Sequence, residues 1–217
     1  MEILIKKLHG IMEKCRLYGD KLEKELVNDH IAHDPRHSCF AMVFNNSTIT
    51  LELLSYYYEI WGKMHGDNVE EIERAKKENA ERCIESTKWL FIGSMSSMEF
   101  CVKESIKLYP KSSIVKELQR KKYIYLSDIV RKSSEEGLIS KKAEEDWIHI
   151  IELRNLVVHN NGIADKDDSY SIGSLCITLM NGKMAKGKLD FFIDLVEFSI
   201  ENYNSLINNL VKYGSTI

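Results

Sequence analysis

Residues 154–159 (RNLVVH) place an arginine and a histidine close enough in the chain to act on one phosphate group. The planar guanidinium of Arg154 suits the geometry of phosphate oxygens and would stabilise extra negative charge at phosphorus. A histidine such as His159 can accept or donate a proton near neutral pH. The amide of Asn155 can position a phosphate or hold the imidazole ring. These residue types together indicate acid–base chemistry at a phosphate.

A helix from about residue 141 to residue 159 must position these groups. Ser140 is its expected N-cap, and Gly162 lies just past its expected end. Arg154 falls in the middle of the apolar seam of this helix, where a buried guanidinium would need a partner. Asn155 and His159 are four residues apart and share a neighbouring strip, and the helix end favours a positive charge. The apolar residues that define the seam are Ala143, Trp147, Ile150, Ile151, Val157 and Val158.

The stretch 153–160 (LRNLVVHN) closely resembles the signature of the HEPN superfamily, an arginine, often followed by asparagine, and then a histidine. The flanking residues 136–140 (EGLIS) and 161–163 (NGI) also look like those of defence-type and toxin-type members. The specific match covers roughly residues 128–165, and the general helical layout extends it from about residue 69 to the C-terminus. Members of this family are four- or five-helix domains that usually dimerise.

The resemblance implies a metal-independent endoribonuclease without a cofactor, with Arg154 and His159 of two protomers at one shared cleft. RNA and a second copy of the chain are then the expected partners, and a protein antitoxin is a further one. Asn160 is a weaker candidate for the role of Asn155 in holding the phosphate. Glu99 is expected to face Arg154 and orient it, as an acidic residue on a neighbouring helix does in some members.

Two other interpretations of the same residues stay open. The chain could be a non-catalytic HEPN module that binds RNA, nucleotide or a protein partner, with Arg154 gripping a phosphate. It could also be a plain helical interaction protein in which Arg154 pairs with Glu99 and His159 merely ends a helix. RNA cleavage that depends on a dimer would distinguish the endoribonuclease from both of these alternatives. Affinity for RNA or nucleotide would distinguish the binding module from the plain interaction protein.

Composition narrows the class of protein. The net charge is −3, so RNA binding would need a local basic surface, for which Arg120, Lys121 and Lys122 are the best candidates after Arg154. The five cysteines are odd in number and widely spaced, which indicates reduced thiols in a cytoplasmic protein. No apolar run approaches the roughly 18 residues that span a bilayer, so no membrane contact is expected.

Two further groups of residues could carry chemistry, and each has a plainer explanation. His30, His33, His37 and Cys39 could be taken for a metal cluster, but their spacing matches no closed zinc site. We therefore interpret them as a polar connection and expect no metal site. The aromatic run 56–58 with Trp61 could stack on bases, but a packed helix face is the simpler interpretation.

The periodicity predicts a mostly all-α fold, a HEPN-like antiparallel helical bundle with a small β-hairpin before the C-terminal helix. Residues 1–65 are expected to be a helical extension packed on the bundle, and residues 66–217 to be the HEPN-like domain. Early helices are predicted at 3–27 and, capped by Ser47, at 48–64. A further helix is predicted over 69–109, with capping-box spacing at Asp67 and Glu70. The small residues Gly93 and Ser94 are expected to kink or split it.

The second half of the chain completes this layout. A helix starting at Ser112 or Ser113 is predicted to carry the basic triplet, and Ser127 is predicted to cap a short helix that ends at Gly137. A hairpin is expected at about 170–189, because Asn181-Gly182 is a strong turn signal. The last helix is predicted over about 191–213.

Overall fold

The computed structural model describes residues 2–26, 34–66, 68–109, 112–118, 120–185 and 187–214. These residues form seven helices and one small antiparallel sheet of two strands, which precedes the last helix. The predicted mostly α-helical class with a hairpin before the C-terminal helix is therefore confirmed. In this described part of the chain, no helix is both long and apolar enough to span a bilayer.

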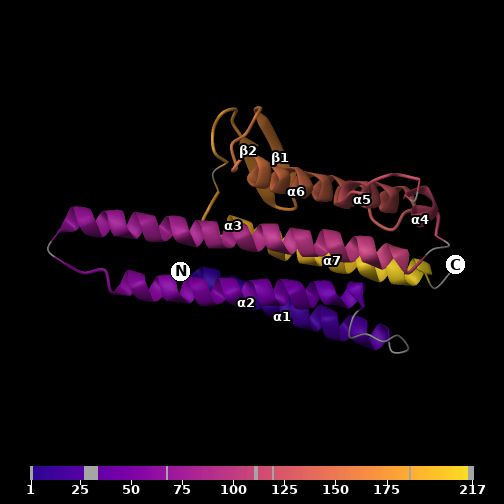
Figure 1. Ribbon diagram of the computed structural model, residues 1–217, viewed down its shortest axis with the longest axis horizontal. Helices are drawn as coiled ribbons and strands as arrows, with labels where there is room; N and C mark the ends of the chain where they lie inside the picture. Colours follow the sequence, from indigo (N-terminus) through magenta and orange to yellow (C-terminus); the bar gives the residue numbers. More distant parts are fainter. Residues whose placement is uncertain are drawn as a thin grey trace.

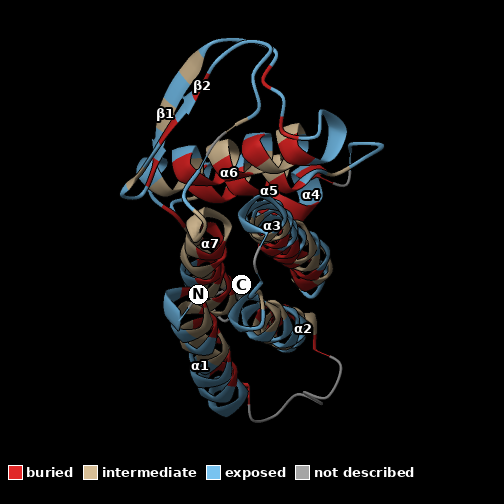
Figure 2. Ribbon diagram, turned by 90° about the vertical axis from the view of Figure 1, so that its left-hand side faces the viewer, coloured by how far each residue is buried: buried red, intermediate tan, exposed pale blue. Residues whose placement is uncertain are grey.

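Four long helices form the body of the molecule. Seen nearly end-on, they occupy the four corners of a bundle, and each contacts its two neighbours (Figure 2). Their apolar stripes meet inside this bundle in one buried core, which includes Leu8, Phe91 and Tyr203. The helices are α1 (Glu2–Glu25), α2 (Pro35–Gly62), α3 (Val69–Lys107) and α7 (Phe191–Gly214).

A second layer lies across α3 and α7 (Figure 1, Figure 2). Its central helix is α6, and the fully buried Trp147 and Ile150 of α6 join the same core. The layer consists of α4 (Ser113–Leu118), α5 (Leu126–Glu135), α6 (Lys141–His159), β1 (Asp168–Ile172) and β2 (Leu175–Leu179).

The helix α2 is longer than predicted. It begins at Pro35, where the side chain of Asp34 accepts a hydrogen bond from the backbone N–H of Arg36 (2.9 Å). Ser47, which was expected to cap a helix, lies buried in the middle of α2. That prediction was wrong because the polar run at 45–47 does not break the helix. Thr50 satisfies its hydroxyl within the helix by donating to the carbonyl of Asn46 (2.9 Å).

The helix α3 is a single helix of 39 residues, about 58 Å long, so the expected split at Gly93-Ser94 was wrong. A Cβ at Gly93 would lie 3.2 Å from the side chain of Asn46, so the small residue lets α2 and α3 approach closely. The two helices project together beyond the ends of α1 and α7 (Figure 1). Asp67 lies outside the described residues; Asn68 caps α3 by accepting from the N–H of Glu71 (3.3 Å).

The start of α5 also differs from the prediction. Ser127 lies within its first turn, and the carboxylate of Asp128 accepts a hydrogen bond from the backbone N–H of Tyr125 (3.0 Å) at the N-cap. The preceding α4 ends at Leu118. The basic triplet therefore lies in the connection between α4 and α5, and its predicted place on a helix was wrong.

The hairpin occurs earlier in the chain than predicted. Its strands are joined at Gly173-Ser174, where Ile172 pairs with Leu175, and Gly173 has a positive φ of 54°. Asn181-Gly182 does form a turn, but the segment after it returns to the end of α6, where Met184 pairs with Ile163. The predicted returning strand at 183–189 was wrong because this segment pairs with a distant partner instead of with the preceding strand.

Candidate functional site

The limits of α6 fix the position of the candidate residues. Ser140 caps its start, accepting from the N–H of Ala143 (3.1 Å) as predicted. At its end the N–H of Gly162, at a φ of 79°, donates to the carbonyl of Leu156 (3.1 Å). His159 is the last residue of the helix, and its side chain is exposed to solvent.

Arg154 lies at the edge of the buried face of α6 and is half-buried. The predicted place in the middle of the seam was wrong, because the buried stripe runs through Trp147, Ile150, Leu153 and Val157, while Val158 is 38% exposed. From this edge the guanidinium keeps one side against α3 and the other toward solvent.

The guanidinium of Arg154 is held by neutral oxygen atoms. One terminal nitrogen donates to the amide oxygen of Asn155 (3.1 Å), and the other donates to the hydroxyl of Ser96 on α3 (3.3 Å). Its Nε is buried and has no hydrogen-bond partner. In the described part of the chain Arg154 makes no ion pair, so its charge is not neutralised.

Glu99 was expected to face Arg154 and orient it, but the two side chains do not form a hydrogen bond or an ion pair with each other. Its carboxylate instead accepts a hydrogen bond from Lys103, one helical turn further along α3 (2.6 Å). Both Glu99 and Arg154 nevertheless line the same pocket. An orienting role for Glu99 would thus have to act at a distance, and this role stays a prediction.

The catalytic candidates share one pocket, which we call the arginine pocket. Arg154, Asn155 and His159 form its α6 side, and Glu99 comes from α3. Its volume is about 530 Å³, within the range of pockets that hold whole small molecules. None of the lining residues comes from α1 or α2. The lining residues are Met95, Glu99, Tyr125, Leu126, Ser127, Ile151, Arg154, Asn155 and His159.

A second pocket of about 370 Å³ adjoins the first, and Asn155 and His159 line both. Asn160 lies here and not in the arginine pocket. Three carboxylates line it, of which Asp168 pairs with Lys166 (2.8 Å). Burial, followed by the charges of Glu152 and Asp168, raises the pKa of Tyr170 to about 12. The lining residues are Glu152, Asn155, Leu156, His159, Asn160, Asp165, Lys166, Asp168, Tyr170 and Leu179.

The basic triplet is exposed and lines neither pocket. Lys121 is engaged by Asp128 (2.7 Å) at the start of α5. Burial alone would raise the pKa of Asp128, but the hydrogen bonds from Lys121 and Tyr125 outweigh it and the pKa is lowered. Within the described residues, Arg120 and Lys122 are exposed and make no ion pair, so their charges stay available to a bound polyanion.

Sequence reasoning missed several residues of the arginine pocket. Tyr125 and Ser127 line it, and Ser96, which lies outside the lining, accepts a hydrogen bond from Arg154. Ser96 and Arg154 are 58 residues apart, so only the packing of α3 against α6 reveals the pair. The closeness of Tyr125 to the basic triplet was the one signal in the sequence that could have pointed to this rim.

No metal site is evident in the part of the chain that the structure describes, where no group of three or more His, Cys, Asp or Glu side chains is arranged to hold an ion. His30 and His33 lie outside that part, and His37 and Cys39 lie in the first turns of α2. All five cysteines are described, and none forms a disulfide.

Comparison with models of protein families, with curated proteins and with solved structures finds no match to this chain. The geometry of the site must therefore support any functional assignment by itself.

Proposed function

We propose that the protein is a metal-independent endoribonuclease that acts as a homodimer, in a toxin–antitoxin or phage-defence setting. The observation that carries this proposal is the arginine pocket, in which the unneutralised charge of Arg154 and the exposed imidazole of His159 face one space. The HEPN-like stretch 153–160 supports the same function. RNA is then the substrate, the cytoplasm is the expected compartment, and a protein antitoxin is an expected partner.

The proposed reaction needs both an acid and a base. The ribose 2′-OH attacks the adjacent phosphorus as a base removes its proton, and an acid protonates the leaving 5′-oxygen. Arg154 stabilises the added negative charge on the phosphate oxygens, since a guanidinium can bind two of them at once. Asn155, which already holds Arg154, positions the phosphate beside His159. The products carry 2′,3′-cyclic phosphate and 5′-hydroxyl ends.

A second copy of the chain would supply the missing proton-transfer group. His159 is the one histidine in the described lining of the arginine pocket, whereas the reaction uses two such groups. Two copies related by a twofold axis would bring two His159 side chains together.

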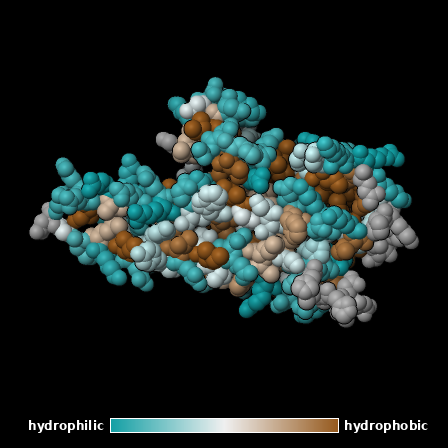
Figure 3. Space-filling view, in the orientation of Figure 1, coloured by the Kyte–Doolittle hydropathy of each residue, from teal (hydrophilic) through white to brown (hydrophobic). Residues whose placement is uncertain are grey.

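The outer face of α3 supports this dimer. Weakly polar and hydrophobic side chains gather along the middle of the face formed by α2 and α3 (Figure 3). On α3, Trp89 and Phe100 are 65% and 55% exposed. Ser96, which binds Arg154, lies between them on the same strip, so a partner covering this surface would lie beside the pocket. Gly93 is not part of this strip's free surface, because it lies against Asn46 of α2 within the chain.

RNA cleavage in the presence of EDTA tests the proposal. Wild-type protein is expected to cut labelled RNA and to leave 2′,3′-cyclic phosphate ends. His159→Ala and Arg154→Ala should abolish cleavage while the dimer, measured by sedimentation, persists. His9→Ala, which changes an exposed histidine on α1, is the matched control and should cut like the wild type. Cleavage retained by both purified pocket variants would contradict the proposal.

The alternative is a non-catalytic HEPN module that binds RNA, nucleotide or a protein partner. The observation that favours it is that the pocket of one chain holds a single histidine beside an arginine, which suffices to bind a phosphate. A folded protein that binds RNA through Arg154 but cuts none of several RNAs would support this function instead.

A further inference from the structure

The arginine pocket is larger than a phosphate group requires. Its volume of about 530 Å³ falls among those of pockets that enclose whole drug-sized molecules, typically about 300–1,000 Å³. Arg154, Asn155 and His159 occupy its α6 side. The space between this side and α3 is therefore available to the rest of a nucleotide.

The remaining walls suit the flat, largely apolar faces of a base. Met95 from α3 and Ile151 from α6 contribute apolar surface, and Leu126 adds to it from α5. Tyr125 lines the pocket and is 59% exposed, so its ring is accessible. Proteins commonly hold unpaired RNA bases by stacking them on such aromatic rings.

One polar group in the lining can distinguish between bases. Glu99 is the only carboxylate among the described lining residues, and its Oε1 accepts from Lys103 (2.6 Å). Lys103 also lies over the ring of Tyr125, 6.0 Å from its centroid, so it links the two lining residues Glu99 and Tyr125. A carboxylate accepts hydrogen bonds and donates none, and it can accept two parallel N–H bonds.

We propose that the arginine pocket binds guanine, as the base of the nucleotide next to the scissile phosphate. Guanine presents two adjacent donors, N1–H and the N2 amino group, to the carboxylate of Glu99, whereas each other base presents one donor there. Tyr125 stacks on the base, and Arg154 holds the adjoining phosphate. Glu99 is then a specificity-determining residue. The inference rests on the proposed function for its place in RNA cleavage.

Sequencing the ends produced from an RNA pool of random sequence tests the preference. Wild-type protein should cut with guanine enriched about tenfold at one of the two positions that flank the cut. Glu99→Gln should lose this enrichment while still cutting at other sites. The matched control is Glu104→Gln, which changes another α3 glutamate that pairs with a lysine (Lys107, 2.5 Å) but does not line the pocket. It should keep the wild-type preference.

The base distribution separates recognition from a structural role. If Glu99 only supported Arg154, Glu99→Gln would slow cleavage at all sites alike and leave the distribution unchanged. That outcome, or a wild-type distribution without guanine enrichment, would overturn the inference.

Direct binding of nucleoside monophosphates, measured by calorimetry, separates failure of the subsite from failure of the proposed function. Guanosine monophosphates (3′ and 5′ forms) should bind about tenfold more tightly than the adenosine forms, and Glu99→Gln should abolish the difference. Tyr125→Ala should weaken the binding of the monophosphates of all four bases, and Tyr125→Phe should retain the wild-type affinities. If the guanine preference holds without RNA cleavage, the subsite stands and the nuclease proposal falls. If RNA is cut but neither the cleavage sites nor the binding affinities favour guanine, only the guanine subsite falls. If RNA is not cut and the affinities do not favour guanine, both proposals fall.

Discussion

The guanidinium of Arg154 is held in place without being neutralised. Asn155 orients one terminal nitrogen from the same helix and Ser96 orients the other from α3, and both acceptors are neutral. A carboxylate in either place would lower the attraction of the site for phosphate. This arrangement keeps the charge available to a ligand and limits the rotamers that the long side chain can adopt.

A substitution that retains the charge tests the importance of this geometry. Arg154→Lys is expected to reduce RNA cleavage by about 10²- to 10³-fold, because one ammonium cannot bind Ser96, Asn155 and two phosphate oxygens together. Single-turnover cleavage with excess protein measures the chemical step. Arg131→Lys, at an exposed position of α5, is the control. A lysine variant as fast as wild type would show that the charge alone suffices.

At the scale of elements, the hairpin is attached to the last helix through a glycine. Gly173 has a φ of 54°, and a Cβ there would lie 2.5 Å from the ring of Phe198 on α7. The residue therefore meets two demands, a left-handed backbone and close contact with α7. Gly182 meets only the first, since its φ is 70° and nothing lies within 4 Å of its Cβ position.

These two glycines make a matched pair for measuring how the hairpin is attached. Gly182→Ala should lower the free energy of unfolding by about 1 kcal/mol, which is the cost of a left-handed alanine. Gly173→Ala should cost roughly 1–3 kcal/mol more, because the ring of Phe198 must also move. Urea unfolding of both variants gives the difference. Equal losses would mean that the hairpin does not pack tightly against α7.

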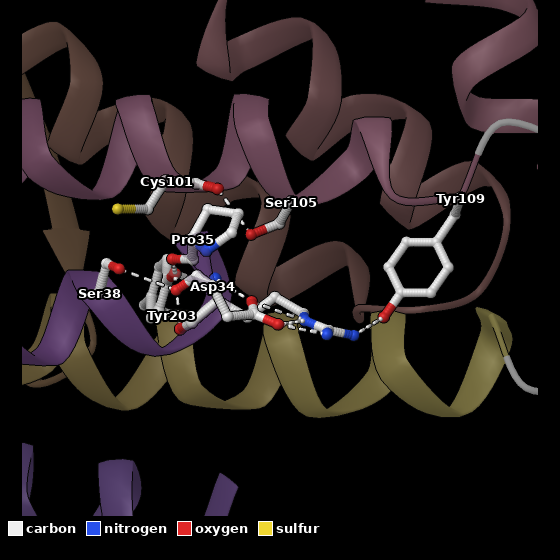
Figure 4. Close-up of polar contacts among 8 residues, drawn as sticks. Asp34, Pro35, Ser38, Cys101, Ser105, Tyr109 and Tyr203 are labelled. Carbon is white, nitrogen blue, oxygen red and sulfur yellow. Dashed lines mark hydrogen bonds and ion pairs between the residues drawn. The ribbon is translucent and has the colours of Figure 1, made fainter. Parts of the chain in front are cut away.

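At the scale of the whole molecule, a buried polar network joins three of the long helices. The Arg36 guanidinium binds the Asp34 carboxylate through its Nε (2.9 Å) and through a terminal nitrogen, and it donates to the hydroxyl of Tyr109 just after α3 (2.6 Å). Tyr203 of α7 donates to the carbonyl of Arg36 (3.2 Å). Figure 4 shows Asp34, Tyr109 and Tyr203 converging from their separate segments. The network connects the start of α2 to the end of α3 and to the middle of α7.

This network makes stability depend on pH. Burial alone would raise the pKa of Asp34, but hydrogen bonds from Arg36 and its charge outweigh burial, so the pKa is lowered. A carboxyl with a lowered folded-state pKa stabilises the fold above its unfolded pKa of about 3.9, and this contribution is lost as the pH falls through the folded value. Asp34→Asn should therefore cost roughly 3 kcal/mol at neutral pH, because Arg36 loses its buried counter-charge.

Urea unfolding at several pH values measures this effect. The gap between wild type and Asp34→Asn should be constant from pH 7 down to about 5 and then narrow below about 4. Asp20→Asn, which changes an exposed carboxyl of α1, should show no such gap. A gap that persists unchanged at low pH would show that the effect of Asp34 is not due to its ionisation.

The predicted boundary between an N-terminal extension (residues 1–65) and a HEPN-like domain (residues 66–217) stays a prediction.

The sequence by itself determined the helical class and the limits of α6. Ser140 and Gly162 end this helix through hydrogen bonds that span only a few residues, so local residue types suffice to place His159 at its last turn. The spacing of Arg154, Asn155 and His159 likewise follows from the helical repeat. These features were predictable because the groups that satisfy one another are neighbours in the chain.

Only the tertiary structure decided which groups face the candidate residues. Ser96 binds Arg154, and Tyr125 lines the same pocket as Arg154, because α3, α5 and α6 pack together. Likewise, the residues after Gly182 pair with Ile163 and not with the preceding strand. Partners far apart in sequence satisfied these groups, and the energies of such contacts depend on packing that no local pattern contains.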